Sequence, residues 1–409
     1  MNNLNHNEML VGLDIGTSKV VVIVAEAKSD SSVEILGLGT HPSRGLKNGV
    51  VVDIESTTNA IKKSILEAES MAGCHISSCY VGISGSHIRG LNSEGVVPIK
   101  DGDVKYGDVD RVIETAQAMA IPADQKLLHV LPRDYIIDKQ DGIKEPLGMA
   151  GSRLEAKVHL VTCSNNASQN IHKCVSRCGL EVEAFVLEQL ASSYSVLSKD
   201  ERELGVCLID IGGGTTDIAV FMDGSISFTD VIPIAGDHVT NDIAEALRTP
   251  ATQAEDIKQK YGCAVSSLTS PDELMMVPGV GGRPERELSR QALADVLERR
   301  YVEIFSMVQQ KLNLSGFESL IPAGIVLTGG ASKVEGSTEL AEEVFHAPVR
   351  LGYPKSVEGL EEIINNPIYS TSVGLLLYGQ KKLQEDHLNY LSRDKNILSR
   401  ITRWFGGNL

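Results

Sequence analysis

The chain has 409 residues, of which 42% are hydrophobic and 22% charged, as is typical of a globular protein with more than one domain. Its formal net charge of −16 argues against broad electrostatic binding to nucleic acid. We expect neither a signal peptide nor a membrane span, because no stretch approaches the ~20 apolar residues that a span needs. Seven cysteines at irregular spacings favour reduced thiols. A metal site at His172, Cys174 and Cys178 is the less favoured alternative to thiols buried on a helix.

A strand, a tight turn and a second strand are predicted over residues 9–23. The turn contains an acid, a glycine, two hydroxyl residues and a lysine, namely Asp14, Gly16, Thr17, Ser18 and Lys19. Backbone N–H groups that no Cβ screens form a donor nest suited to an anion. A strand at 33–39, an amphipathic helix at 54–71 and a strand at 80–85 are expected to follow.

About seventy residues then precede the next predicted core strand, at 158–162, which is enough for a small α/β subdomain. They contain a predicted helix at 107–118 and short strands at 127–131 and 135–138. Beyond them we expect a helix at 169–178, a strand at 182–187 and a helix that starts near Glu188. The small residues of this last helix permit close crossing of another helix.

The same strand–turn–strand order recurs at residues 207–221. Its turn contains Asp210, Gly212, Gly213, Gly214, Thr215 and Thr216. Either turn by itself could be an ordinary β-turn. Two Asp-Ile-Gly turns, each opening one half of the chain, predict two related domains with a nucleotide held between them. A carboxylate beside a phosphate needs a cation between them, so Asp14 and Asp210 imply Mg²⁺, which they would orient through water.

The second half continues with a strand at 226–234 and a helix that opens at Gly236 and includes Asn241. A further helix is expected at 252–260, then loops and short strands at 266–286. A long amphipathic helix is predicted at 286–312, with its core residues at Leu288, Leu293, Val296, Leu297, Val302 and Ile304. A strand then leads to Gly329, Gly330 and Ala331, with Ser332 as the expected helix N-cap. A helix of small and apolar residues follows at 369–377.

In this order, the three glycine turns resemble the phosphate-1, phosphate-2 and adenosine loops of the actin, Hsp70 and sugar-kinase ATPase superfamily. Further segments resemble one family within it, the bacterial actin-like cell-division proteins called FtsA. They are Pro42–Gly45, Leu190–Leu197, Gly281–Pro284 and Tyr369–Leu376. The resemblance covers nearly the whole chain. It implies the α/β actin-like ATPase fold, with two related domains around a nucleotide cleft and a small inserted α/β subdomain in the first half.

The resemblance also implies domain boundaries. The first core domain (1A) would comprise 1–84, 157–204 and 369–380, with the inserted subdomain (1C) at 85–156. The second core domain (2A) would comprise 205–236 and 321–368, with an outer subdomain (2B) at 237–320. A linker at 381–395 would lead to an amphipathic helix at 396–409.

For the cleft, the resemblance implies ATP with Mg²⁺. The expected ATP-binding residues are Asp14, Gly16, Thr17, Ser18, Lys19, Asp210, Gly212, Gly213, Gly214, Thr215, Thr216, Gly236, Asn241, Glu255, Lys258, Gly329, Gly330 and Ala331. Glu255 and Lys258 would hold the ribose and the adenine, or else form a surface ion pair. Glu188 matches the position whose acid or amide orients the attacking water or a Mg²⁺-bound water, although Gln189 follows it where the superfamily often has proline. Its alternative is an acid placed at a helix N-terminus by the dipole.

The last residues combine apolar and basic side chains. At ~100° per residue, Ile397, Leu398, Ile401, Trp404 and Phe405 fall within one ~120° sector, with Arg400 and Arg403 on the other side. Such a helix suits the surface of an anionic membrane. A terminal helix docked on its own domain is the alternative.

The function implied by the resemblance is that of an ATP-bound, self-associating adaptor. It would bind the C-terminal tail peptide of the tubulin-like protein FtsZ at the outer subdomain, where Arg283 and Arg286 are candidates, and would recruit other division proteins. It would act as a peripheral protein at the cytoplasmic face of the inner membrane, at the division septum. Weak ATP hydrolysis and none are both compatible with these residues. A small-molecule kinase of the same superfamily is the alternative function, and a chaperone-like ATPase is less favoured because no long substrate domain follows residue 380.

Overall fold

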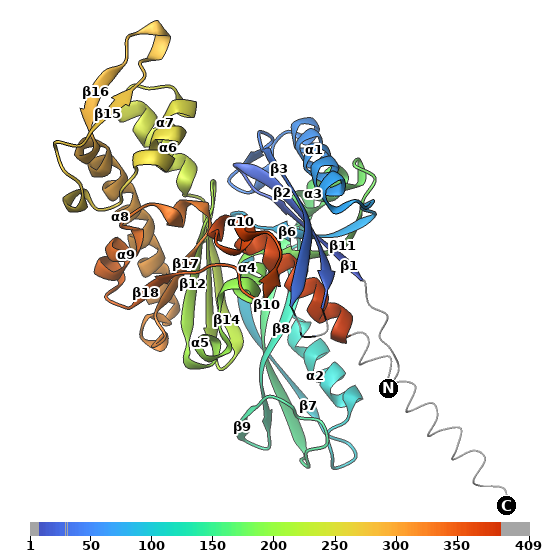
Figure 1. Cartoon of the computed structure of the whole chain (residues 1–409). Coiled ribbons are helices and arrows are strands. Elements are labelled where there is room, and N and C mark those ends of the chain that lie inside the picture. Colours follow the sequence, from blue (N-terminus) through green and yellow to red (C-terminus); the bar gives the residue numbers. More distant parts are fainter. Residues whose placement is uncertain (1–7, 29, 31, 386–409) are drawn as a thin grey trace, which may run out of the picture.

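The computed structural model describes residues 8–28, 30 and 32–385 (Figure 1). Its first core sheet has the strand order β11-β6-β1-β2-β3-β19. The β1–β2 hairpin carries the first glycine turn, and β1 pairs with β6 in parallel. The strands are β1 (Met9–Ile15), β2 (Lys19–Ala27), β3 (Val33–Pro42), β6 (Ser78–Ile83), β11 (Glu181–Leu187) and β19 (Val357–Glu358). Buried aliphatic side chains line both faces of this sheet, which is why β2 is a nearly continuous apolar run.

The helices of this half are α1 (Ile54–Ala72) and α3 (Asn165–Ser176), which contact each other. A small two-stranded sheet of β4 (Leu46–Lys47) and β5 (Val50–Val51) precedes α1. Asp53 caps the N-terminus of α1 by accepting a hydrogen bond from the Ser56 amide, and Gly73 ends the helix in the left-handed conformation. The helix predicted at 54–71 is therefore confirmed.

The second core sheet repeats this plan with the order β14-β13-β12-β17-β18. The β12–β13 hairpin carries the triple-glycine turn, and β12 pairs with β17 in parallel. The strands are β12 (Val206–Ile211), β13 (Thr216–Met222), β14 (Ser225–Ile232), β17 (Ile325–Thr328) and β18 (Val349–Leu351). Each half thus presents its hairpin turn at a corresponding place, as the repeated motif predicted.

The outer part of the second half contains α6 (Gly236–Ala246), α7 (Ala251–Tyr261), α8 (Arg290–Ser315) and the hairpin of β15 (Leu274–Val277) and β16 (Arg286–Ser289), with α9 (Ser337–Phe345) beside α8. The long helix begins at Arg290 and not at residue 286, because residues 286–289 pair with β15. Ser289 then caps α8 by accepting a hydrogen bond from the Ala292 amide. Two of the residues predicted as buried in this helix are not: Leu288 lies on β16, and Val302 is exposed.

The turn after β17 also differs from the prediction. Gly330–Lys333 forms a short 3₁₀ turn, and α9 starts only at Ser337. Ser332 therefore does not cap a helix; its hydroxyl donates to the carbonyl of Gly329 at 2.7 Å within the turn.

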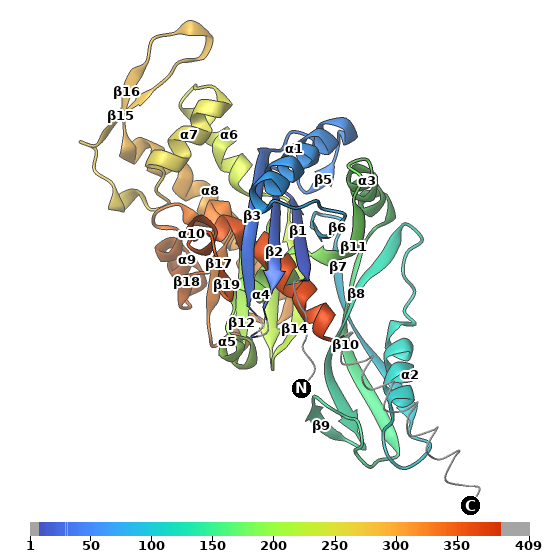
Figure 2. The same cartoon turned by 45° about the vertical axis from the view of Figure 1, so that its right-hand side comes forward.

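The inserted subdomain has its own sheet, ordered β7-β10-β8-β9, with α2 (Tyr106–Gln117) packed on it. Its strands are β7 (Arg89–Pro98), β8 (Gln125–Ile137), β9 (Gln140–Ile143) and β10 (Arg153–Ser164). Residues 158–162, expected to return to the core sheet, belong instead to β10 and pair with β7 and β8. The two short strands expected at 127–131 and 135–138 are one long strand, β8. Figure 2 shows this subdomain at the end of the molecule opposite to β15 and β16.

Two helices, together called the hinge below, cross between the halves: α4 (Glu188–Val196) and the helical residues 370–385, called the hinge helix. A Cβ at Gly374 would overlap the carbonyl oxygen of Ala191, so the crossing requires glycine there. Ser195 donates a hydrogen bond to the carbonyl of Ser370 at 2.7 Å. The short helices α5 (Lys199–Leu204) and α10 (Glu361–Ile364) contact β13 and the turn Pro367–Tyr369, respectively.

The start of the predicted linker, 381–385, continues the hinge helix, and Leu383 packs against the first core. The remainder of the linker and the amphipathic segment 396–409 lie outside the described residues. Among the described helices, none is both long and apolar enough to span a membrane.

Candidate functional site

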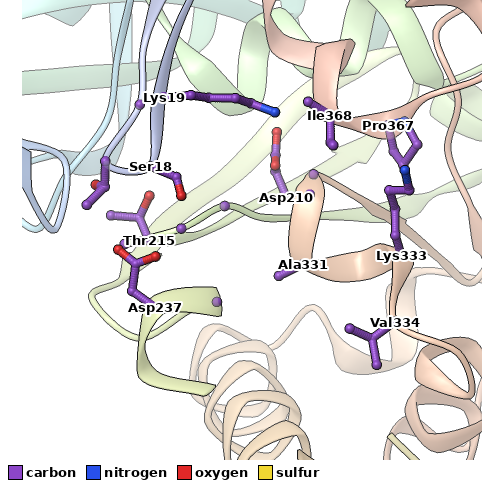
Figure 3. A pocket seen from close by; sticks show the side chains of 18 of the residues that line it. Ser18, Lys19, Asp210, Thr215, Asp237, Ala331, Lys333, Val334, Pro367 and Ile368 are labelled. Atoms are coloured by element: carbon purple, nitrogen blue, oxygen red, sulfur yellow. The ribbon is translucent and has the colours of Figure 1, made fainter. Parts of the chain in front are cut away.

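A cleft of about 660 Å³ lies between the two halves. Its walls come from both hairpin turns, the N-terminal ends of α4 and α6, α7, and the turn after β17. Figure 3 shows Ser18 and Thr215 next to each other on one side of the cleft, Ala331, Lys333 and Pro367 on the other side, and Lys19 extending toward Asp210. The architecture brings together residues that are far apart in the chain, because each half supplies its own hairpin.

The two hairpin turns approach so closely that side chains on the glycines would block the contact. A Cβ at Gly213 would lie 2.8 Å from Ser18 Oγ, and one at Gly214 would overlap Thr17 Oγ1. The turn of the second half is closed by a hydrogen bond from the Gly212 amide to the carbonyl of Thr215, at 3.0 Å. The hydroxyl residues and glycines of both turns therefore line one space, as an anion site requires.

Four of the acids that line the cleft form a cluster: Asp14, Asp210, Asp217 and Glu188. Burial raises the pKa of Asp14 to about 6, with a further rise caused by Asp210. Burial also raises the pKa of Asp210 to about 6 and that of Asp217 to about 7. The pKa of Glu188 is raised well above its usual range by burial and then by Asp14, Asp217 and Asp210. Such a cluster favours binding of a cation, which would stabilise all four charged forms.

Hydroxyl groups orient the three aspartates. Ser372 donates to Asp14 Oδ2 at 3.3 Å, and Thr371 donates to Asp210 Oδ2 at 3.1 Å. Asp217 accepts from Thr215 Oγ1 at 2.9 Å and from Ser84 Oγ. Ser84 follows β6 in the first half, so its bond to Asp217 joins the two halves beneath the turns.

Lys19 is the basic residue nearest the first turn. Its Nζ lies 5.5 Å from the centroid of the Tyr369 ring. Burial lowers the pKa of Lys19 to about 8, and Asp14 partly opposes this change. A bound phosphate would stabilise the protonated amine.

At the other end of the cleft, Lys258 is buried on α7 and is not part of a surface ion pair. It donates to the carbonyl of Gly236 at 3.0 Å and to Thr240 Oγ1 at 2.8 Å, and it pairs with Glu255 at 2.7 Å. The pKa of Glu255 is lowered, with Lys258 opposing the effect of burial. This network fixes the N-terminal turn of α6 against α7.

Most residues predicted for the site line this cleft, but two do not. Thr216 is buried, and its hydroxyl donates to the carbonyl of Ile234 at 2.7 Å. Asn241 is exposed on α6 and is absent from the cleft lining. Sequence reasoning missed several lining residues: Asp217, Asp237, Gln259, Lys260, Gly262, Arg290, Lys333, Pro367, Ile368 and Thr371. Only Asp217 carried a local signal, because it is the second residue of β13, directly after the Gly-rich turn.

The cysteine cluster is accounted for by burial. All seven cysteines are free thiols, and Cys178 Sγ donates to the carbonyl of Cys174 at 3.2 Å. Across the described part of the chain, no three His, Cys, Asp or Glu side chains are arranged to hold a metal ion directly.

Comparison with known proteins agrees with this architecture. The family model "Cell division protein FtsA" matches residues 207–374, and that of the "SHS2 domain inserted in FTSA" matches 85–162. The chain is 61% identical to the cell division protein FtsA of Pseudomonas aeruginosa over 417 residues, covering 100% of both chains. It is 47% identical to the FtsA of Escherichia coli over 405 residues, covering 97% of this chain and 96% of that one.

Among solved structures, a PilM–PilN type IV pilus biogenesis complex matches with a TM-score of 0.67 at 17% identity, covering 91% of this chain and 99% of that one. MreB5 of Spiroplasma citri bound to ADP matches with a TM-score of 0.56 at 16% identity, covering 93% and 99%. These two likenesses concern the fold, which is that of the actin-like ATPases. The full-length identity to curated relatives goes further: this chain belongs to the FtsA family of actin-like cell-division proteins.

Proposed function

We propose that the chain binds ATP with Mg²⁺ in the cleft and acts as a self-associating adaptor that anchors the FtsZ ring to the membrane. The observation that carries the nucleotide part is the meeting of the two glycine turns, whose glycines and hydroxyl residues line one space beside four clustered acids. MreB5, which shares the fold, has been solved with ADP. Phosphates would lie between the turns, with the adenosine toward Lys258 and Ala331.

Mg²⁺ fits the chemistry of these residues. Acids with raised pKa values, to which no lysine or arginine of residues 8–385 is bonded, favour a divalent cation. Asp14 and Asp210 would hold the ion through water, with the phosphates as its other ligands. The ion would neutralise phosphate charge.

Isothermal titration calorimetry with MgATP tests the cleft. We expect saturable binding by the intact protein and binding at least tenfold weaker for Lys19→Ala. If folded wild-type protein showed no binding heat on titration with MgATP, the proposed nucleotide binding would be wrong.

Glu188 is the candidate for orienting an attacking water. Its position at the first residue of α4, facing three aspartates, suits a polarising or proton-accepting role. Glu188→Ala should lower ATP turnover while leaving ATP affinity within a few-fold of wild type. Unchanged turnover would exclude this role.

The membrane part of the proposal is supported by the amphipathic pattern at 396–409 and by family membership. Co-sedimentation with anionic vesicles should be strong for the full chain and lost on deletion of 396–409. A single short helix binds weakly, so attachment should also strengthen with self-association. Equal sedimentation of both forms would contradict the anchor.

The FtsZ part is supported by family membership and by the position of the outer subdomain away from the inserted one (Figure 2). Arg283 is exposed there, whereas Arg286 donates a hydrogen bond to the carbonyl of Leu247. We expect a fluorescent FtsZ tail peptide to bind the intact chain, and Arg283→Glu to weaken that binding. Binding that Arg283→Glu leaves unchanged would move the peptide site elsewhere.

A further inference from the structure

The inserted subdomain contacts the first half of the cleft through a buried histidine. His129, on β8, accepts a hydrogen bond at 3.0 Å from the backbone amide of Leu187, through its Nε2. Leu187 is the N-cap of α4, and Glu188 follows it into the cleft. The His129 ring also packs against Tyr378 of the hinge helix, with ring centroids 6.2 Å apart. One side chain of the inserted subdomain thus contacts both helices of the hinge.

A second buried histidine connects the same subdomain to the other half. His159, on β10, is 1% exposed and lies between Asn92 of β7 and Thr229 of β14. The amide nitrogen of Asn92 donates to the carbonyl of Ser227 at 3.1 Å, so its Oδ1 is the acceptor that faces His159 Nδ1. Nδ1 therefore carries the proton, and Nε2 accepts from the Thr229 hydroxyl at 2.9 Å.

The fit around this second contact is tight. A Cβ at Gly90 of β7 would overlap Thr229 Oγ1 and lie 2.9 Å from the His159 ring. A third bond, from Ser225 Oγ to the carbonyl of Arg133 at 3.2 Å, joins β14 to β8. Val231 of β14 packs in the same apolar cluster as Val161 of β10. β14 is therefore held by the inserted subdomain through polar and apolar contacts.

Burial keeps both histidines neutral, as these hydrogen bonds require. Desolvation lowers the pKa of His129 to about 4, with Lys382 adding to the effect. It lowers the pKa of His159 to about 4 as well, with Arg133 adding to the effect. Both contacts are thus present throughout the neutral pH range.

We propose that the inserted subdomain is a brace across the nucleotide cleft, with His129 holding the Glu188 turn of the first half and His159 holding β14 of the second. No residue of 85–164 lines the cleft, so the brace acts from outside it. Any nucleotide-dependent change in the angle between the halves must strain or tighten one of the two contacts. Occupancy of the cleft is then linked to the conformation of the inserted subdomain. This inference rests on the proposed ATP binding.

Hydrogen–deuterium exchange on the full-length protein tests the brace, with MgATP as the probe. We expect MgATP to slow exchange at least threefold in peptides covering 89–98 and 153–164, although these residues do not touch the cleft. Thr229→Val, which keeps the side-chain shape but cannot donate to His159, should abolish this response. Thr229→Ser, which keeps the hydroxyl, should retain it.

His129 is tested separately as a positioning residue. His129→Leu leaves the Leu187 amide without an acceptor and should weaken MgATP binding at least fivefold. His129→Gln offers a carbonyl acceptor and should recover most of that affinity, which a purely space-filling role would not predict.

The outcomes separate the two proposals. MgATP binding by calorimetry without any exchange change in 89–98 and 153–164 of the wild type overturns the brace alone. So does a Thr229→Val protein that responds like wild type, or a His129→Gln protein as weak as His129→Leu. Failure of the wild type to bind MgATP overturns the brace together with the proposed function.

Discussion

Asp14, Asp210 and Asp217 are costly to the nucleotide-free protein, because each is held in a buried site near the others. Their pKa values are raised, so the folded protein binds these protons more tightly than the unfolded chain does. Groups that oppose stability in this way tend to be retained where function needs them. At the scale of single residues, the buried acids lower the stability of the nucleotide-free protein and, in return, provide affinity for a cation and the phosphates that it accompanies.

Asp210→Asn tests this exchange. The pKa of Asp210 rises from 3.8 to about 6 on folding. The folded state therefore loses stability as the pH increases from 3.8 to about 6, and it loses no further stability from this group at higher pH. The Asn side chain does not titrate, and its amide oxygen can still accept the hydrogen bond that Thr371 donates. Above pH 6 its nucleotide-free unfolding free energy should exceed that of wild type by on the order of 1–3 kcal/mol, while MgATP affinity falls at least tenfold.

Urea denaturation from pH 4 to pH 8 measures the effect, and Asp295→Asn is its control. Asp295 is an exposed acid on α8, so removing its charge should change neither stability nor affinity appreciably. If the difference in unfolding free energy between wild type and Asp210→Asn did not vary with pH, the titration of Asp210 would not be its cause.

At the scale of elements, the hinge depends on two helices that cross at backbone contact. Gly374 of the helical residues 370–385 meets Ala191 of α4, and Gly12 of β1 lies against the same helix near Ser372. Small residues at these positions let helix and sheet approach closely. The small side chains of Ala191, Ser192 and Ser193 are explained by this packing.

Gly374→Ala should destabilise the protein by roughly 2–4 kcal/mol, because the new methyl group overlaps the Ala191 carbonyl and forces the helices apart. Gly107→Ala on α2 is the matched control. A Cβ there meets nothing within 4 Å, and alanine favours helix, so stability should rise by about 0.5–1 kcal/mol. Thermal unfolding of both variants measures the difference, and equal melting temperatures would show that the crossing tolerates a wider spacing.

At the scale of the whole molecule, a ligand in the cleft contacts both halves and should stabilise them together. MgATP at 100 times its dissociation constant adds about 2.7 kcal/mol to the unfolding free energy, which corresponds to several degrees in melting temperature. ATP with EDTA should give a clearly smaller increase, because the acids then repel the phosphates. Differential scanning calorimetry checks both; equal increases with and without the metal would argue against an ion held by Asp14 and Asp210.

The sequence alone determined the features that are encoded locally. The glycine turns, the period-2 and helical apolar patterns and the family resemblance located both hairpins, most helices and most of the cleft lining. They succeed because a tight turn with bare amides, or an apolar strand, is a property of adjacent residues. FtsA family membership, read first from such segments, is borne out by identity along the full chain.

Only the tertiary structure decided those features of the site and the fold that depend on contacts between residues far apart in the chain. Ser84 bonds to Asp217, 133 residues away, and Ser372 to Asp14, 358 residues away, and nothing local to those serines marks them. Residues 153–164 read equally well as a core strand, and only pairing with β7 and β8 assigns them to the inserted sheet. His129 and His159 resemble ordinary strand residues until packing sets them against the two halves of the cleft. Hydrogen bonding and burial between distant segments are fixed by how the domains pack, and no sequence window contains that information.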